Sequence, residues 1–474
     1  MSKTRISTTV LSGVMRKICK STGFSVGFFL ALRRRCAGAA LKSAVLVLAV
    51  VLLAVGPVPV SAAAPDPVLE WIDVMNTTVL AAGTAPNVTS RVVALVSASV
   101  FDAVNGIDPS FRPLLVRPNA PHNASQRAAA IQAAYAILFN LYPSGTLTAR
   151  RDASIAALAS TEKAEAIAAG VAWGQTVADA IWASRLTDGF APTPPPFLGV
   201  LGIVGTPGAV GFWRPTPQGL PDQPPGNPGA TPQIATMTPW VLTRPSQFRL
   251  PPPLALNSPE YAADLNELKS MGVYSGSGRS DDQSELALFW ALNTPLAWNR
   301  IAAQLSAKRG LTLTENAHLF ALLNLSLSDS LIACWDSKYR YVFWRPITAI
   351  RAGLTPSDAD PTWVPWLDFF KSGTPAHPEY PSAHSSLSGA AAFTLAAAFG
   401  ENTDFSLTSE VRPGTTRSFH SFSDATAEIA DARVFGGIHF RTSCVRANAL
   451  GRAVADYVAR HAMRPRGDDR DEED

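Results

Sequence analysis

TLTENAHLFALLNLSLSDSLIACWDSKYRYVFW, from Thr312 to Trp344, is the stretch that decides the fold class. Its apolar residues recur at intervals of three and four, and strand-like alternation is scarce, which is the pattern of an α-helix. Thr312 with Glu315 three residues later fits a capping box, in which each side chain bonds the other residue's backbone N–H. We therefore expect a helix to begin at this point.

The same intervals run through most of residues 67–186, and helical patterns resume from about residue 259. Between Gly189 and Pro253 the chain has 17 prolines, too many for regular structure, but the aromatic residues of GFWRPTP and MTPWVL need something to pack against. An ordered irregular excursion over the helices is therefore expected. The sequence predicts an all-α helical bundle with these segments: a leader over 1–62, an N-terminal helical region over 63–188, the Pro-rich excursion over 189–257, a helical core over 258–463 and a disordered acidic tail over 464–474.

The first 62 residues carry nine basic side chains and no acid, and they run into the apolar stretch AVLVLAVVLLAV and small residues near Ala62. This is the pattern of a signal peptide cleaved near residue 62, so the protein is expected to be exported, either secreted or periplasmic. The alternative is an uncleaved leader that anchors the chain in a membrane, and we expect membrane contact only in that case.

Without the leader, 40 − 9 = 31 basic and 37 acidic residues remain, so the formal charge becomes 31 − 37 = −6. No basic patch with interleaved aromatics points to nucleic acid. Export leaves two options open for Cys334 and Cys444, a disulfide or two buried thiols. The oligomeric state is also open, with a homodimer among the options.

Lys338 and Arg345 in KYRYVFWRP are seven residues apart. On one continuous α-helix they would project from the same face, about 10 Å apart along the axis. Pro346 favours a helix exit at Arg345, which would place the guanidinium at a bend. Either arrangement lets two cations hold an anion, although a solvated basic helix end has the same composition.

The stretch HPEYPSAHSS contains Ser382, a good N-cap, followed by Ala383 and His384 at the start of an apolar run. Free backbone N–H groups at a helix start bind anions. In ARVFGGIHFR, Arg433 and His439 cannot share one helix face, but two glycines between them can end one helix and let the next begin near residue 438. Each motif has a structural explanation by itself; together they predict a site for phosphate or a similar oxyanion.

The motifs K-x6-R-P, P-S-G-H and R-x5-H, in this order, resemble those of vanadium-dependent haloperoxidases and the type 2 phosphatidic acid phosphatase superfamily. Here they read Lys338 to Pro346, Pro381 to His384 and Arg433 to His439. The resemblance implies an all-helical fold that holds vanadate, with phosphate as the alternative occupant. The oxyanion-binding residues would be Lys338, Arg345, Ser382, the backbone N–H of Ala383, and Arg433.

The resemblance implies three alternatives for activity. In a haloperoxidase, His439 would ligate vanadium axially, His384 would assist proton transfer, and Lys338 would polarise hydrogen peroxide for attack by halide. In a phosphomonoester hydrolase, His439 would attack a phosphate ester to form a phosphohistidine, and His384 would protonate the leaving alkoxide. The third alternative is an inactive oxyanion-binding helical protein.

Three positions bear on this choice. Ala383 replaces the usual glycine, which adds a methyl group and disfavours any backbone conformation with positive φ. Ser443 stands four residues after His439, where superfamily phosphatases usually carry Asp, and a ligand histidine tolerates this loss better than a nucleophile does. His377 stands where brominating members tend to carry His, which makes it a candidate halide-side residue.

Overall fold

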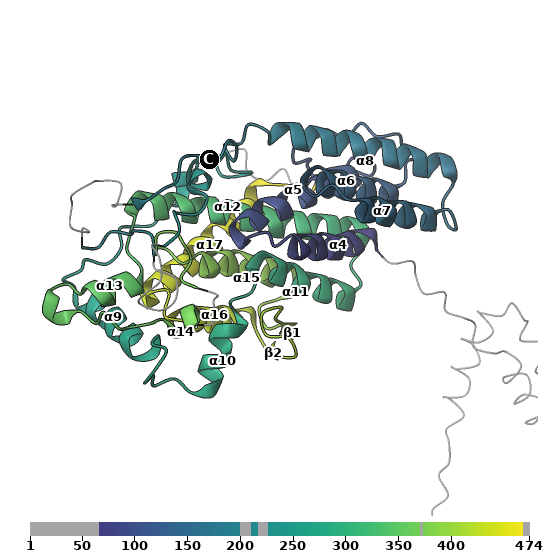
Figure 1. The fold of residues 1–474 in the computed structure, drawn as a ribbon. Helices are drawn as coiled ribbons and strands as arrows, with labels where there is room; N and C mark the ends of the chain where they lie inside the picture. The colour runs from purple at the N-terminus through teal and green to yellow at the C-terminus, as the bar shows by residue number, and fades with distance from the viewer. Residues whose placement is uncertain (1–65, 200–209, 217–225, 370–372, 468–474) are drawn as a thin grey trace, which may run out of the picture. The chain divides into compact units, whose positions relative to one another are not determined.

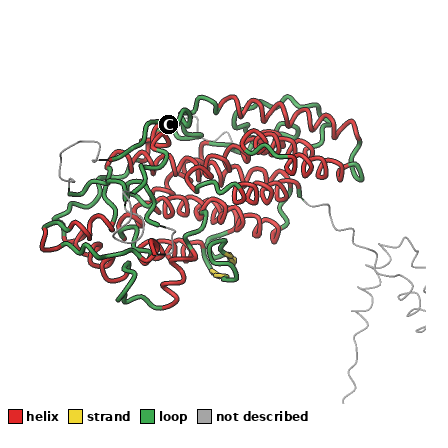
Figure 2. Tube along the Cα trace, in the orientation of Figure 1, coloured by secondary structure: helices red, strands yellow, loops and turns green. Residues whose placement is uncertain are grey.

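The computed structural model describes residues 66–199, 210–216, 226–369 and 373–467. These residues form fourteen α-helices, three short 3-10 helices and one two-stranded hairpin, and Figures 1 and 2 show that helices dominate the described part of the chain. The prediction of an all-α fold is confirmed. The predicted leader lies outside the described residues, and the predicted segment boundaries remain predictions.

The first group of helices follows the predicted N-terminal pattern, and several begin at an N-cap side chain. Asp66 accepts a hydrogen bond from the backbone N–H of Val68 at 2.7 Å, and Pro67 occupies the first helical position. Helix α6 packs against both α5 and α8. The bounds of this group are α4 Pro67–Ala81, α5 Pro86–Asn105, α6 Gln126–Leu141, α7 Gly145–Leu158 and α8 Ala164–Ser184.

The second group of helices carries the three motifs. A hairpin of two short antiparallel strands, which the sequence pattern did not predict, pairs Phe405 with Phe419 between α15 and α16. The bounds are α9 Pro259–Met271, α10 Asp281–Phe289, α11 Thr294–Arg309, α12 Leu313–Tyr341, α13 Pro346–Ala352, η4 Pro356–Asp358, α14 Trp366–Phe369, α15 Ala383–Phe399, β1 Phe405–Thr408, β2 Thr416–Phe419, α16 Phe422–Phe435 and α17 Arg441–His461.

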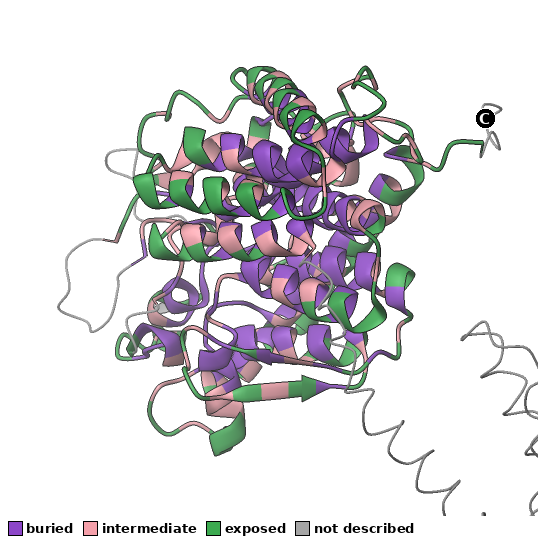
Figure 3. Ribbon diagram, turned by 90° about the vertical axis from the view of Figure 1, so that its right-hand side faces the viewer, coloured by how far each residue is buried: buried purple, intermediate pink, exposed green. Residues whose placement is uncertain are grey.

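Helix α12 is the centre of the core. The capping box at its start is confirmed, with the Glu315 carboxylate accepting from Thr312 N at 2.8 Å and Thr312 Oγ1 accepting from Glu315 N at 3.3 Å. The helix packs against α5, α15 and α17, and Figure 3 shows the buried surfaces of the helices facing inward. Helices α5 and α12 are long and apolar enough to cross a membrane, but 83% and 89% of their most apolar windows are buried inside the protein.

The described parts of the Pro-rich segment are irregular and attached to α12. Two 3-10 helices, η2 Pro232–Thr236 and η3 Pro245–Phe248, interrupt the segment. The buried carboxylate of Asp329 on α12 accepts hydrogen bonds from the backbone N–H groups of residues 240–242, at 2.7 to 3.0 Å. Trp213 N donates to Val342 O at 2.7 Å, and Trp344 N donates to Gly211 O at 3.0 Å. The segment therefore supports the chain on both sides of Phe343, next to the motif that contains Arg345.

Helices α15 and α17 approach each other closely through two glycines. A Cβ added at Gly451 would lie 1.9 Å from Ser386 O, and one added at Gly389 would lie 2.3 Å from Asn448 O. Any larger side chain at these positions would push the two helices apart. Cys334 and Cys444 are both buried thiols, and no disulfide joins them within the described part of the chain.

Candidate active site

The first motif lies where α12 ends. Lys338 is in the last turn of α12, Val342 ends the helix in the left-handed conformation (φ 49°), and Arg345 is the extended N-cap of α13. The chain therefore bends between the two cations, and the alternative of one continuous helix is wrong. Lys338 Nζ donates to the carbonyls of Pro378 and Glu379, both at 2.8 Å.

Arg345 is fully buried and contacts two of the site histidines. Its Nη2 donates to His377 Nδ1 at 2.9 Å, and its Nη1 donates to His439 Nε2 at 3.2 Å. Two more hydrogen bonds, to the carbonyls of His377 and Ile438 at 2.9 Å each, fix the guanidinium in place. Asp336, in the last part of α12, forms a bidentate pair with Arg249.

The second motif forms the start of α15, as predicted. Ser382 is the N-cap and its Oγ accepts from Ser385 N at 3.5 Å. Ala383 is the first residue of the helix, and its backbone does not adopt positive φ. The imidazole of His384 hydrogen-bonds the backbone of Leu292, while its buried Nε2 has no hydrogen-bond partner among the residues that the structure describes.

The third motif spans the junction of α16 and α17. Helix α16 ends at Phe435, Gly437 takes the positive φ of 76° that the turn requires, and α17 begins at Arg441. The predicted break at the glycines is confirmed, although the next helix begins three residues later than expected. Arg433, in the last turn of α16, donates to Trp290 O at 3.1 Å, and its buried Nε has no hydrogen-bond partner in the described segments.

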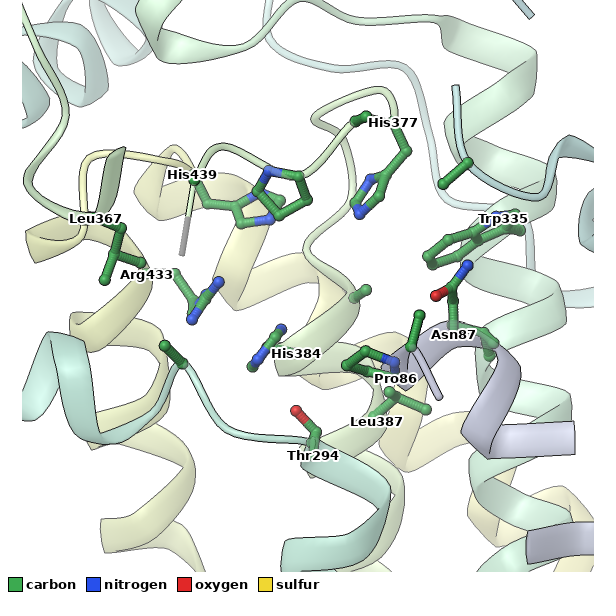
Figure 4. A pocket seen from close by; sticks show the side chains of 18 residues that line it. Pro86, Asn87, Thr294, Trp335, Leu367, His377, His384, Leu387, Arg433 and His439 are labelled. Carbon is green, nitrogen blue, oxygen red and sulfur yellow. The ribbon is translucent and has the colours of Figure 1, made fainter. Parts of the chain in front are cut away.

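A cavity of about 310 Å³ lies where the three motifs meet. Figure 4 shows His384, Arg433 and His439 on one side of it, and His377 and Trp335 on the other. Its remaining wall is mostly apolar and includes Leu331, Leu367, Leu387, Pro86 and Ala291. Of the eight predicted site residues, His377, Ala383, His384, Arg433 and His439 line the cavity, whereas Lys338, Arg345 and Ser382 lie directly behind that lining.

Glu379 is a site residue that the sequence reasoning missed. Its carboxylate is fully buried, and Oε1 accepts from His439 Nδ1 at 2.8 Å and from Phe440 N at 3.1 Å. Oε2 accepts from Ser443 Oγ at 3.1 Å. The expectation that Ser443 leaves His439 without a carboxylate partner is therefore wrong, because the partner comes from the loop before α15.

The electrostatics of the site are those of a buried positive region. Burial lowers the pKa of Lys338 to about 7 and those of Arg345 and Arg433 to about 10. Burial also raises the pKa of Glu379 to about 7. The net charge of the site is +2 in two states. When Lys338 and Glu379 are both charged, three cations and one carboxylate give 3 − 1 = +2. When both are neutral, the two arginines alone give +2. Burial lowers the pKa values of His384 and His439 well below the ordinary range, so both imidazoles are neutral at pH 7.

These features fit an oxyanion such as vanadate or phosphate. Buried cations without carboxylate partners destabilise a fold unless an anion compensates their charge. Arg433 and His384 line the cavity, and their buried Nε and Nε2 atoms make no hydrogen bond within the described part of the chain. In the described part of the chain, no three His, Cys, Asp or Glu side chains gather as they would around a bare metal cation. An oxyanion held at this place would accept hydrogen bonds from the cations.

Comparisons with known proteins agree with this assignment. Residues 318–468 match the family model described as the VCPO second helical-bundle domain. Vanadium chloroperoxidase of Curvularia inaequalis is 25% identical over 177 residues, which cover 31% of this chain and 29% of that protein. The alignment thus spans under a third of the curated relative.

Two solved structures extend the similarity over most of the chain. A bacterial vanadium-dependent iodoperoxidase is 26% identical with a TM-score of 0.71, covering 84% of this chain and 96% of that one. The apo form of a bacterial vanadium-dependent chloroperoxidase shares the fold at 21% identity and a TM-score of 0.63, covering 79% of this chain and 94% of that one. The chain is thus similar to vanadium haloperoxidases in sequence and in fold.

Proposed function

We propose that this chain is a vanadate-dependent haloperoxidase-like enzyme that oxidises halide with hydrogen peroxide. One observation carries the proposal: Arg433 and two neutral histidines, His384 and His439, line one cavity, and the buried cations Lys338 and Arg345 lie directly behind its lining. The reaction consumes one halide, one peroxide and one proton, and yields hypohalous acid and water. Halide loses two electrons as the O–O bond breaks.

Each side chain has a defined task in this proposal. Arg345, Arg433 and protonated Lys338 would neutralise the oxygens of vanadate, and His439 would offer its Nε2 lone pair as the ligand. When bound, vanadium(V) would supply a Lewis acid that polarises peroxide, and the oxidation state of the vanadium would not change. His384 has a free Nε2 at the cavity and is neutral at pH 7, so it can take a proton from entering peroxide and return it to the leaving oxygen.

Lys338 and His377 complete the proposed assignment. The Lys338 ammonium lies behind the loop of residues 378 and 379, where it would hold negative charge on the oxyanion. His377 lies across the cavity from His384 and stacks at a tilt on Trp335, with ring centroids 4.9 Å apart. This position supports the proposal that His377 is a halide-side residue.

The second candidate is a phosphomonoester hydrolase, and one observation favours it. The contact between Glu379 and His439 gives the imidazole the carboxylate partner that a histidine nucleophile uses. The protonation state of His384 argues against the hydrolase. A general acid must be protonated, and burial lowers the pKa of this histidine. The remaining alternative is an oxyanion-binding protein without activity.

The test uses the full-length protein freed of phosphate. Iodide and bromide oxidation by peroxide are assayed with and without orthovanadate, and hydrolysis of p-nitrophenyl phosphate is assayed in parallel. We expect halide oxidation that requires vanadate, is inhibited by phosphate, and is absent in His439→Ala. Hydrolysis that vanadate inhibits, with no halide oxidation, would overturn the proposal in favour of the phosphatase. Vanadate binding with neither activity would favour the inactive protein.

We also propose that the protein is exported and that the leader is removed near residue 62. The proposal is supported by the basic leader and the apolar stretch after it, and by the first described helix, which begins at Pro67. Intact-mass measurement of the secreted or periplasmic protein tests it. A mature chain that begins between about residues 60 and 66 is expected, and a chain that retains the leader in the membrane fraction would contradict it.

A further inference from the structure

We propose that Glu379 is the positioning residue of His439, holding the imidazole in the tautomer that directs the Nε2 lone pair to the oxyanion. This inference rests on the proposed function, because it assigns a task within the same site. Glu379 is not among the residues that line the cavity, so it acts through His439 and does not touch the substrate.

The hydrogen bonds around His439 define its tautomer. Glu379 Oε1 can only accept when the carboxylate is ionised, so Nδ1 of His439 carries the hydrogen of the 2.8 Å contact. On the other side of the ring, Arg345 Nη1 can only donate, so Nε2 accepts at 3.2 Å. Both contacts require the same tautomer, and it is the one with a lone pair at Nε2.

The carboxylate is itself held by groups from the start of α17. Phe440 N donates to Oε1 and Ser443 Oγ donates to Oε2, both at 3.1 Å. Lys338 Nζ donates to the backbone carbonyl of the same residue at 2.8 Å. Glu379 therefore connects the end of α12, the loop before α15 and the start of α17, and it fixes the ring plane of His439 relative to the cations. Partners of ligand histidines raise the basicity of the ligating nitrogen as well as orienting it.

Ser443 provides a way to relocate the carboxylate. Its Oγ lies 3.1 Å from Glu379 Oε2, so an acidic side chain at position 443 would reach into the space that Glu379→Ala vacates. This relocation tests whether His439 needs a carboxylate beside its Nδ1, or whether Glu379 is needed only for packing.

The experiment compares vanadate with phosphate, since both need the cations and only vanadate would bond to His439 Nε2. The full-length protein is titrated with each anion by calorimetry. In Glu379→Gln we expect the vanadate Kd to rise by about 10-fold to 100-fold, while the phosphate Kd changes by less than about 3-fold. In the double variant Glu379→Ala with Ser443→Asp, vanadate affinity is expected to recover at least tenfold relative to Glu379→Ala. Glu428→Gln, which removes a carboxylate that pairs with Arg417 outside the site, is the matched control.

Other outcomes overturn the inference. Equal losses for both anions would make Glu379 a structural residue, and no loss for either would leave it without a role. The nitrogen-15 chemical shifts of His439 in the ligand-free protein give a second reading that does not depend on the reaction. We expect hydrogen at Nδ1 in the wild type and a mixture of tautomers in Glu379→Gln. If the wild type oxidises no halide but the His439 tautomer changes in Glu379→Gln, the proposed function fails and the positioning role stands. An unchanged His439 tautomer in Glu379→Gln refutes the positioning role.

Discussion

Arg433 carries a buried charge for which the protein offers little compensation. Among the described residues, its guanidinium donates to one carbonyl, that of Trp290, and has no carboxylate partner. Burial lowers its pKa to about 10, which is the sign of a charge that is destabilised by its surroundings. Such a residue contributes to ligand binding and lowers the stability of the ligand-free fold.

Replacement of Arg433 by Met is therefore expected to separate stability from binding. The free energy of unfolding of the ligand-free variant should not fall and should rise by up to about 2 kcal/mol, because an uncompensated buried charge is removed. Phosphate affinity should fall by at least tenfold in calorimetry. Arg417→Met is the control, since Arg417 pairs with Asp282 and Glu428; it should lower stability and retain phosphate binding. A large loss of stability in Arg433→Met would contradict this account.

The substitution Ala383→Gly tests the one motif position that departs from the family pattern. Residue 383 lies in helical backbone and keeps its N–H at the start of α15, so no positive φ is required of it. We expect the vanadate Kd to stay within about 3-fold and the free energy of unfolding to fall by about 1 kcal/mol or less. A gain of more than tenfold in affinity would show instead that the methyl group obstructs the oxyanion.

At the scale of elements, the crossing of α15 and α17 sets the spacing of the site. Helix α15 begins with Ala383 and His384, and α17 begins two residues after His439. The two helices touch at Gly389 and Gly451, so their separation is fixed by the absence of side chains there. Because the site lies at one end of this crossing, a change in the crossing alters the distance between the two histidines.

Gly451→Ala is expected to disturb the site from a distance. The added Cβ would lie 1.9 Å from Ser386 O, which forces α15 and α17 apart and should lower the free energy of unfolding by about 1–3 kcal/mol. Phosphate affinity should fall by about tenfold because the distance between His384 at the start of α15 and His439 before α17 changes. Chemical denaturation and calorimetry measure the two effects. Gly145→Ala, where an added Cβ meets nothing within 4 Å, is the control and should change neither; normal phosphate affinity in Gly451→Ala would refute the coupling.

Most of the helices could be predicted because their signals are local. The capping box of α12, the N-cap Ser382 and the glycine break after Arg433 each depend on a few neighbouring residues. Glu379 could not be assigned in this way, because its partners His439 and Ser443 are about sixty residues away and meet it only after folding. One signal was present: Glu379 is the only acid between Asp368 and Glu401, and it lies within HPEYPSAHSS. The hairpin β1–β2 was missed because strands of four residues carry too short an alternation to recognise.

For the whole molecule, the charge of the site links stability to anion binding. A ligand that binds only the folded state at 100 times its Kd adds about 2.7 kcal/mol to the free energy of unfolding. Phosphate and vanadate should therefore both raise the Tm of the protein, and Arg433→Met should reduce the phosphate effect. Differential scanning fluorimetry in phosphate-free buffer measures the shift, and an unchanged Tm at saturating phosphate would contradict the assignment of an oxyanion site.

The pH dependence of this stabilisation follows from Lys338. Burial lowers its pKa from an ordinary 10.5 to about 7, so above pH 7 the folded ligand-free protein loses this proton while the unfolded chain keeps it up to about pH 10.5. The unfolded state then binds more protons, and this lysine makes the ligand-free protein more stable as pH rises from 7 to 10.5. Anion binding restores the proton, so the stabilisation by phosphate should decrease over the same window. Lys338→Met should flatten both slopes in thermal unfolding measured from pH 7 to 10, and equal slopes in variant and wild type would exclude Lys338 as their source.

The distribution of the site along the chain also sets an order of events during biosynthesis. Lys338 is made first, but His439 and the Ser443 that supports Glu379 lie at the start of the last described helix, Arg441–His461. Chains emerge from the ribosome from the N-terminus, so the anion site stays incomplete until residue 443 has been made. The oxyanion must therefore enter after most of the chain has been made, and the supply of the ion at that stage decides how many molecules bind it.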